Sequence, residues 1–209
     1  MPQRFFRVPP PFSSFYKLLS CAFLLGILAA SSFAQEVEVS AVKFANVRPA
    51  YDNSANWLEA DITLNVHPAQ GAPGQMVPRV RVELLLGCEV PTPAGGERRT
   101  EYYKAVAECV ALEAGRADVR FYLPPEIVKR DQVHSDPKFW SVDVTAGGRP
   151  QNPSHAGSSP ALASGEARRT FQSRAVSAAV SNDGVLVPQY LTPFDLQYPH
   201  PSFVRHEPR

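Results

Sequence analysis

Glu59 and Asp61 are the first residues of this sequence whose types and spacing could support chemistry. Because they are two positions apart, their side chains would lie on the same face of an extended strand. Glycosidases use such paired carboxylates as acid and base. Trp57 and Trp140 could stack on sugar rings. The simpler interpretation is the polar face of an alternating strand, with the tryptophans packed at the edge of the core. An exported carbohydrate-binding or hydrolytic module is therefore the alternative function.

Asp131, His134 and Asp136 come nearest to a metal or acid–base cluster. A catalytic zinc site usually takes ligands from rigid elements, with two of them one helical turn apart. Here the spacing runs into Ser135 and Pro137, where a short helix is expected to end. We interpret the three residues as solvated turn residues and predict no metal ligand and no cofactor.

The remaining candidates are His155 and Ser158, a pair that a hydrolase could use. They lie in a Pro/Ser/Gly-rich segment with no acidic partner in an ordered element. The sequence also contains no nucleophile elbow, zinc-protease helix, phosphate-binding loop or dinucleotide fingerprint. We therefore predict a protein that is not an enzyme and has no catalytic residues.

Residues 1–34 have the pattern of a cleaved signal peptide. Arg4, Arg7 and Lys17 precede a short apolar run at residues 18–30, and Ser32-Phe33-Ala34 is a small-x-small cleavage site. The apolar run is shorter than the roughly 20 residues that span a bilayer. We expect an exported protein, located in the periplasm, at the outer membrane or at the cell surface, with no transmembrane segment after cleavage.

Cleavage changes both the charge and the cysteine count. Three basic residues and no acidic ones leave, so the formal net charge of +1 becomes −2. Without a basic stripe, nucleic acid is a poor partner. Cys21 leaves as well, and Cys88 and Cys109 remain as an even pair in an oxidising compartment, which predicts a disulfide between them. A redox or nucleophilic cysteine is the weaker alternative, because neither CxxC spacing nor a neighbouring histidine is present.

The elements that position these residues are short alternating strands. Residues 80–90 and 101–112 form a hairpin across a Pro/Gly-rich turn, and both runs are partly apolar on each face, as central strands are. We place Tyr102, Val106, Val110 and Leu112 on one face of the second run. Residues 58–66 alternate most regularly, and a phase shift between Ala41 and Val42 predicts a β-bulge.

The spacing of strands and turns over residues 35–148 predicts an antiparallel β-sandwich of six or seven strands. A short helix is expected at residues 126–133. Residues 149–165 are predicted to be a flexible linker or a long ordered loop. A second helix is expected at residues 166–181, followed by a possible last strand at residues 185–187.

The C-terminal residues alternate prolines with the aromatic residues Tyr190, Phe194, Tyr198 and Phe203. Such a segment cannot form a core of its own. We expect residues 185–194 to pack on the domain, and those beyond Tyr198 to be mobile and available to a protein partner. For residues after about Pro201, a disordered end with no role is the favoured alternative. The four aromatic residues are the candidate partner-binding side chains.

Four stretches, VEVSAVKFANV, NWLEADITLNVHP, KFWSVDVTAGG and NDGVLVPQYLTPF, resemble a family of exported bacterial pilus-like proteins. Members of that family have an immunoglobulin-like fold and are encoded with type IV pilus assembly components. The resemblance covers residues 36–148 and resumes over residues 182–194. It implies an immunoglobulin-like sandwich that contacts other pilus or envelope assembly proteins, and it supplies no site residues.

Two departures qualify this resemblance. The order Trp57, Cys88, Cys109, Trp140 differs from the Cys–Trp–Cys order of antibody domains. The chain also lacks the processing site and long apolar helix of a pilin subunit. The expected function is therefore that of a structural or accessory component of a type IV pilus or a related envelope assembly.

Overall fold

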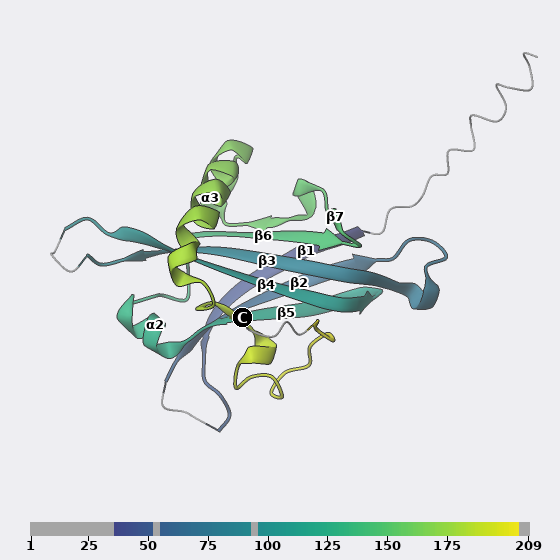
Figure 1. Ribbon diagram of the computed structural model, residues 1–209, viewed down its shortest axis with the longest axis horizontal. Helices are drawn as coiled ribbons and strands as arrows, with labels where there is room; N and C mark the ends of the chain where they lie inside the picture. The colour runs from purple at the N-terminus through teal and green to yellow at the C-terminus, as the bar shows by residue number, and fades with distance from the viewer. Residues whose placement is uncertain (1–35, 52–54, 93–95, 205–209) are drawn as a thin grey trace, which may run out of the picture. The chain divides into compact units, whose positions relative to one another are not determined.

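The computed structural model describes residues 36–51, 55–92 and 96–204. These residues form two antiparallel sheets packed face to face, as predicted from the alternation (Figure 1). The expected signal peptide and its cleavage site lie outside the described residues. The main strands are β1 (Glu36–Val47), β2 (Trp57–His67), β3 (Met76–Val90), β4 (Arg99–Glu113), β5 (Gly115–Leu123) and β6 (Phe139–Ala146).

The strand order resembles that of an immunoglobulin-like sandwich in all but its fourth strand. The first sheet has the order β1-β2-β5-β9, where β9 is Val187–Pro188, and the second has the order β4-β3-β6-β7, where β7 is Arg149–Pro150. An antibody constant domain pairs its fourth strand with the fifth, in the first sheet. Here β4 pairs with β3 instead, so each sheet keeps three long strands.

Alternating apolar residues from both sheets build the core. In β2 the side chains of Leu58, Ala60, Ile62, Leu64 and Val66 are buried, as expected for the most regular strand. Their partners on β5 and the inward residues of β3 and β6 complete one continuous cluster. Burial of apolar area at about 25 cal/mol per Å² is the main stabilising contribution to such a core.

The expected hairpin is β3 and β4, and β3 is central, between β4 and β6. The expectation that the second run is also a central strand was wrong, because β4 is the edge strand of the second sheet. The face assigned to β4 was wrong over most of its length. Tyr103, Ala105, Ala107 and Cys109 point inward, while Tyr102 packs outside against a helix. The inward face of β4 contains mostly small residues. The pairing register sets these small residues opposite large leucine and valine residues of β3, which fill the space between the sheets.

The predicted disulfide is not present: Cys88 and Cys109 are both free and buried. The register places Cys88 opposite Glu101 and Cys109 opposite Val80. Glu101 is eight positions before Cys109 on β4, which corresponds to about 26 Å along a strand. A disulfide needs Cα atoms within about 7 Å, so this strand pairing excludes the bond.

Residues 149–165 form an ordered loop, which is the second of the two expected alternatives. The loop contains β7, two short 3-10 helices (Pro153–His155 and Pro160–Leu162) and β8 (Gly157–Ser158), which pairs with β6. At Gly157 an added Cβ would lie 2.9 Å from Val39 and 3.3 Å from Trp140, so the close approach to β1 requires glycine. The bulge in β1 lies between Val39 and Ala41, near its expected position.

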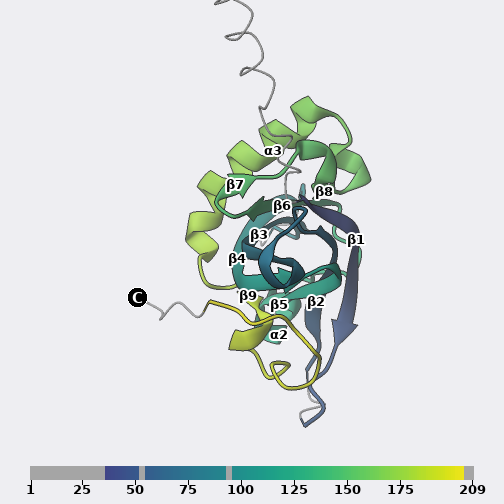
Figure 2. The same cartoon turned by 90° about the vertical axis from the view of Figure 1, so that its right-hand side faces the viewer.

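Helix α3 (Gly165–Ala178) covers the outer face of the second sheet (Figure 2). Ser164 caps it by accepting a hydrogen bond from the Ala167 amide at 3.1 Å. Phe171 and Ala175 pack on Leu85 of β3 in a second, smaller cluster. The other expected helix is α2 (Pro125–Arg130), which begins with proline at its first turn.

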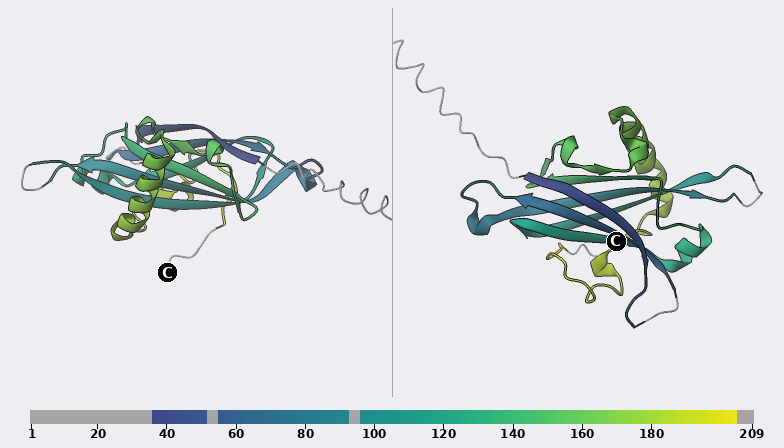
Figure 3. Two further views of the ribbon diagram at one scale, coloured as in Figure 1. Left: turned by 90° about the horizontal axis from the view of Figure 1, so that it is seen from above. Right: turned by 180° about the vertical axis from the view of Figure 1, so that it is seen from behind.

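The chain after α3 runs along the edge formed by β4 and β5. A 3-10 turn (Ala179–Asn182) leads to β9, which pairs with β5, and a further turn (Gln189–Leu191) begins the C-terminal tail, residues 189–204. Figure 2 shows this tail and α3 on opposite sides of the strands. β1 forms the other edge of the first sheet and comes to the front when the molecule is seen from behind (Figure 3).

Candidate functional site

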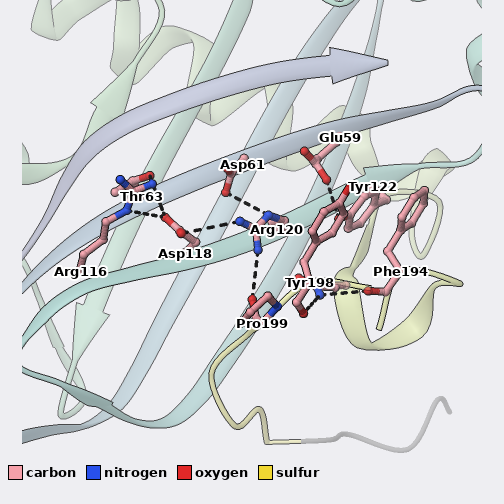
Figure 4. Close-up of polar contacts among 11 residues, drawn as sticks. Glu59, Asp61, Thr63, Arg116, Asp118, Arg120, Tyr122, Phe194, Tyr198 and Pro199 are labelled. Atoms are coloured by element: carbon pink, nitrogen blue, oxygen red, sulfur yellow. Dashed lines mark hydrogen bonds and ion pairs between the residues drawn. The ribbon is translucent and has the colours of Figure 1, made fainter. Parts of the chain in front are cut away.

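A row of polar side chains crosses the outer face of the first sheet, beneath the C-terminal tail (Figure 4). Alternation in β2 and β5 places these residues opposite the core face. The pairing register then sets them side by side, with Glu59 opposite Tyr122, Asp61 opposite Arg120 and Thr63 opposite Asp118. The sequence identified the two carboxylates but not the residues of β5 that face them.

Glu59 is bound to Tyr122, whose hydroxyl donates a hydrogen bond to its carboxylate at 2.7 Å. Burial raises the pKa of the Glu59 carboxyl, although the tyrosine bond and the nearby Arg120 oppose that shift. Burial and the adjoining Glu59 also raise the pKa of Tyr122. The pair is therefore a partly buried hydrogen bond between a phenol and a carboxylate.

Arg120 links the two strands to the tail. Its guanidinium lies 3.3 Å from Asp61 and 3.7 Å from Asp118. It also donates a hydrogen bond to the Pro199 carbonyl at 3.1 Å and stacks over the Tyr198 ring at 5.2 Å. Only 12% of the side chain is exposed, so these contacts enclose the guanidinium. Burial raises the pKa of Asp61, and Arg120 opposes that shift.

Asp118 ends the row by joining both strands. Its carboxylate accepts a hydrogen bond from the Thr63 hydroxyl at 2.9 Å and pairs with Arg116 at 3.2 Å. Arg116 is largely exposed, so this ion pair is screened by water and contributes little to stability. The bond from Thr63, which is itself buried, is the less exposed of the two contacts.

Phe194 attaches the tail to this face. Its ring stacks on Tyr122 with centroids 4.4 Å apart and meets Trp57 edge to face at 5.7 Å. The side chain is fully buried. Aromatic pairs of this geometry add roughly 0.5–1.5 kcal/mol beyond the burial of their area. The prediction that residues up to 194 pack on the domain is confirmed here.

Gln189 holds the tail in a closed loop. Its side-chain amide donates to the Phe194 carbonyl at 3.1 Å and to the Tyr198 carbonyl at 2.8 Å. The residue is completely buried, and its bond to Phe194 is buried while its bond to Tyr198 is partly buried. The side-chain amide of Gln189 thus holds the backbone of residues 190–198 in a loop.

The last described residues, which were expected to be mobile, pair with the edge of β4 in this structure, and residues 205–209 lie outside the described residues. The Val110 amide donates to the Ser202 carbonyl at 2.8 Å, and the Val204 amide donates to the Glu108 carbonyl at 2.7 Å. Phe203 faces Cys109 in this short bridge. The tail therefore spans both sheets, from the face of the first to the edge of the second.

The four candidate partner-binding residues all make contacts within the chain. Phe194 is buried under the tail, and Tyr198 lies on Arg120. Tyr190 and Phe203 contact each other with ring centroids 5.1 Å apart. In this conformation the aromatic residues bind the domain itself, and their binding to another protein stays a prediction.

A second buried polar group lies at the C-terminal end of α2. Asp131, only 4% exposed, accepts a hydrogen bond from the Tyr103 hydroxyl and a bidentate pair from Arg130 at 2.7 and 2.8 Å. The bond from Arg130 lowers the pKa of Asp131, against the effect of burial. The interpretation of Asp131 as a solvated turn residue was wrong, whereas His134 and Asp136 are exposed as expected.

The remaining candidates for chemistry are occupied by structural contacts. Trp57 meets Phe194, and Trp140 meets Phe44 at 5.8 Å. His155 pairs with Glu36 at 2.9 Å, while Ser158 lies in the short strand β8. Within residues 36–51, 55–92 and 96–204, no three His, Cys, Asp or Glu side chains are grouped to hold a metal ion.

The comparisons with known proteins bear on the fold. The chain is similar to a crystal structure of a protein from Akkermansia muciniphila, with a TM-score of 0.63 and 19% sequence identity. The likeness covers 83% of this chain and 95% of the other. At this identity it shows a shared fold. No protein-family model matches the chain, and no curated protein does either.

None of the helices in the described part of the chain is both long and apolar enough to cross a membrane.

Proposed function

We propose that this protein is a non-enzymatic structural or accessory component of an exported assembly, of the type IV pilus or a related envelope kind. It acts through contacts with other proteins. The observation that carries the proposal is the set of contacts that side chains form on the polar face of the first sheet. There Tyr122 donates to Glu59, Asp61 pairs with Arg120, and Arg120 donates to the Pro199 carbonyl of the chain's own tail, so this face already binds an extended polypeptide segment.

Two features of the sequence support the export and the assembly. Residues 1–34 have the composition of a signal peptide, with a small-x-small cleavage site at Ser32-Phe33-Ala34. The four stretches that resemble the pilus-like family lie in β1, β2, β6 and the region of β9. They thus cover both sheets and the start of the tail.

Cell fractionation of the source organism tests the export. The protein should be recovered from the envelope or the medium, with a mass showing that its first residue is Gln35. Full-length protein confined to the cytoplasm would contradict the proposal.

Deletion of the gene tests the assembly function. Loss or shortening of pili, restored by the wild-type gene, is the expected result, and pull-down with the exported protein should recover other assembly proteins. Unchanged pili together with an empty pull-down would refute an assembly role.

A glycan array and a broad hydrolase screen test the non-enzymatic part of the proposal. No turnover and no sugar binding are expected, because Glu59 is held by Tyr122 and both tryptophans pack on other rings. Sugar binding abolished by Trp57→Ala or Trp140→Ala, with the fold intact, would favour the carbohydrate-binding alternative.

A further inference from the structure

We propose that residues Glu108–Val110 of β4, the acceptor edge, bind the C-terminal strand of a second copy of this chain in exchange for their own. The exchange would join copies head to tail. The inference builds on the proposed assembly function and names its partner as the protein itself.

The acceptor edge recognises its strand mainly through the backbone. Both hydrogen bonds that hold residues 202–204 join main-chain atoms, at 2.8 and 2.7 Å. Strand addition of this kind accepts any extended segment that offers a carbonyl and an amide two residues apart. The specificity must then come from the side chain between them, which is Phe203.

Phe203 supplies that specificity by filling the junction between the sheets. Its ring packs against the main core, with Tyr190 at 5.1 Å and His200 at 5.2 Å. His200 in turn pairs with Asp195 at 2.9 Å. A strand from another molecule would need an aromatic residue at this position, and a second copy has it.

The connection to the acceptor edge is short and rich in proline. The last contact with the face of the first sheet before it is the hydrogen bond from Arg120 to the Pro199 carbonyl at 3.1 Å. Only His200 and Pro201 separate that carbonyl from Ser202, and Pro199 and Pro201 restrict the backbone angles of this hinge. Identical segments on short hinges exchange between copies at low cost, because the contacts made are the same in both states.

Exposed apolar side chains lie beside the acceptor edge, and a second copy would bury them on binding. A groove of about 560 Å³ continues from the hinge along the ends of β4 and β5. Met76 and Val110 line it and are 39% and 51% exposed. The exchanged strand would bring the neighbouring molecule directly against these side chains.

Because the exchange is head to tail, its two interacting surfaces differ: one copy gives its strand and the next receives it. Such a contact forms a ring if the rotation closes and an extended chain if it does not. A ring and an extended chain are both consistent with the proposed assembly function, and both depend on Phe203 and the acceptor edge.

Peptide binding to the purified protein tests the acceptor edge. The probe is a fluorescent peptide of residues 198–204. Its affinity should rise about tenfold or more for the Phe203→Ala protein, because apparent affinity scales with the fraction of acceptor edges that are free. Leu196→Ala is the matched control, since Leu196 is 97% exposed, and should bind the peptide as the wild type does.

The same peptide carrying Phe203→Ala should not bind either protein. If Phe203→Ala fails to fold, Val204→Pro takes its place, because it removes the amide that donates to Glu108 while the ring stays. No binding of the wild-type peptide to a folded variant, or equal binding of the mutated peptide, would overturn the proposal.

Light scattering coupled to size exclusion tests the second copy directly. The wild type should form dimers or longer species as its concentration rises, and Phe203→Ala should stay monomeric. A wild type that remains monomeric throughout overturns the exchange. Loss of pili on gene deletion would still support the proposed function in that case, so the two failures are distinguishable.

Discussion

At the scale of single residues, the contact between Tyr103 and Asp131 is the clearest case of a buried polar pair. Tyr103→Phe removes the donor and leaves one carboxylate oxygen with the Arg130 contact alone. We expect a loss of about 1–2 kcal/mol in the free energy of unfolding. Urea titration measures it, with Tyr51→Phe as the control, because Tyr51 is fully exposed and its substitution should change nothing.

The pH dependence of stability follows from the lowered pKa of Asp131. A carboxyl whose pKa is lower in the folded state stabilises the fold above its unfolded value of about 3.9, and this contribution is lost as the pH falls below that value. Asp131→Asn removes the contribution. The melting temperatures of wild type and variant should therefore differ most above about pH 5 and converge towards pH 3.

The raised pKa values of Glu59, Asp61 and Asp143 act in the opposite direction. They are the same in both proteins and cancel in the comparison. A gap between wild type and Asp131→Asn that stays constant from pH 7 to pH 3 would contradict this account.

The two buried cysteines allow a thiol count. Burial raises the pKa of each thiol to about 12, so both are protonated and unreactive near neutral pH. In the folded protein lacking residues 1–34, Ellman's reagent should react slowly, and in urea without reductant it should detect both thiols. A count of zero would mean that they are bonded, and that the strand pairing of β3 and β4 is wrong.

At the scale of the elements, the C-terminal tail acts as a cover for two strands that would otherwise be edges. β9 pairs with β5, and residues 202–204 pair with β4. The side chain of Asn182 binds the Tyr102 carbonyl at 3.0 Å, further along the same edge of β4. Unpaired sheet edges promote aggregation, so residues 182–204 protect the molecule.

Two truncations separate the parts of this cover. Removing residues 199–209 deletes the edge pairing and the Phe203 ring, and should cost about 1–3 kcal/mol of unfolding free energy. Removing residues 185–209 also deletes the buried Leu186, Gln189 and Phe194, and should cost several kcal/mol more. Chemical denaturation measures both. Equal stability of the two truncated proteins would show that residues 185–198 do not complete the domain.

At the scale of the whole molecule, the position of each strand in its sheet sets its protection from hydrogen exchange. β2 lies between β1 and β5, and β3 lies between β4 and β6, so their amides are paired on both sides. We expect the slowest exchange in these two strands and faster exchange in β1 and in residues 149–158. Mass spectrometry of exchanged peptides provides the measurement, and a β1 as slow as β2 would contradict it.

The sequence by itself determined those features that depend on neighbours along the chain. The alternation of residues 58–66 predicted the buried face of β2, and the apolar residues on both faces of 80–90 predicted a central strand. The helix at 166–181 and the bulge in β1 were likewise readable from local pattern. Alternation reports which side of a strand is apolar, and that information is local.

Only the tertiary structure decided which residues meet. The pairing register separates Cys88 from Cys109, and it turns Tyr103 inward, where it binds Asp131. Similarly, Phe194 is buried because Tyr122, far earlier in the chain, provides the ring on which it stacks. Register and docking depend on contacts between residues distant in sequence, and a shift of one residue reverses every side chain of a strand. No local pattern carries that information.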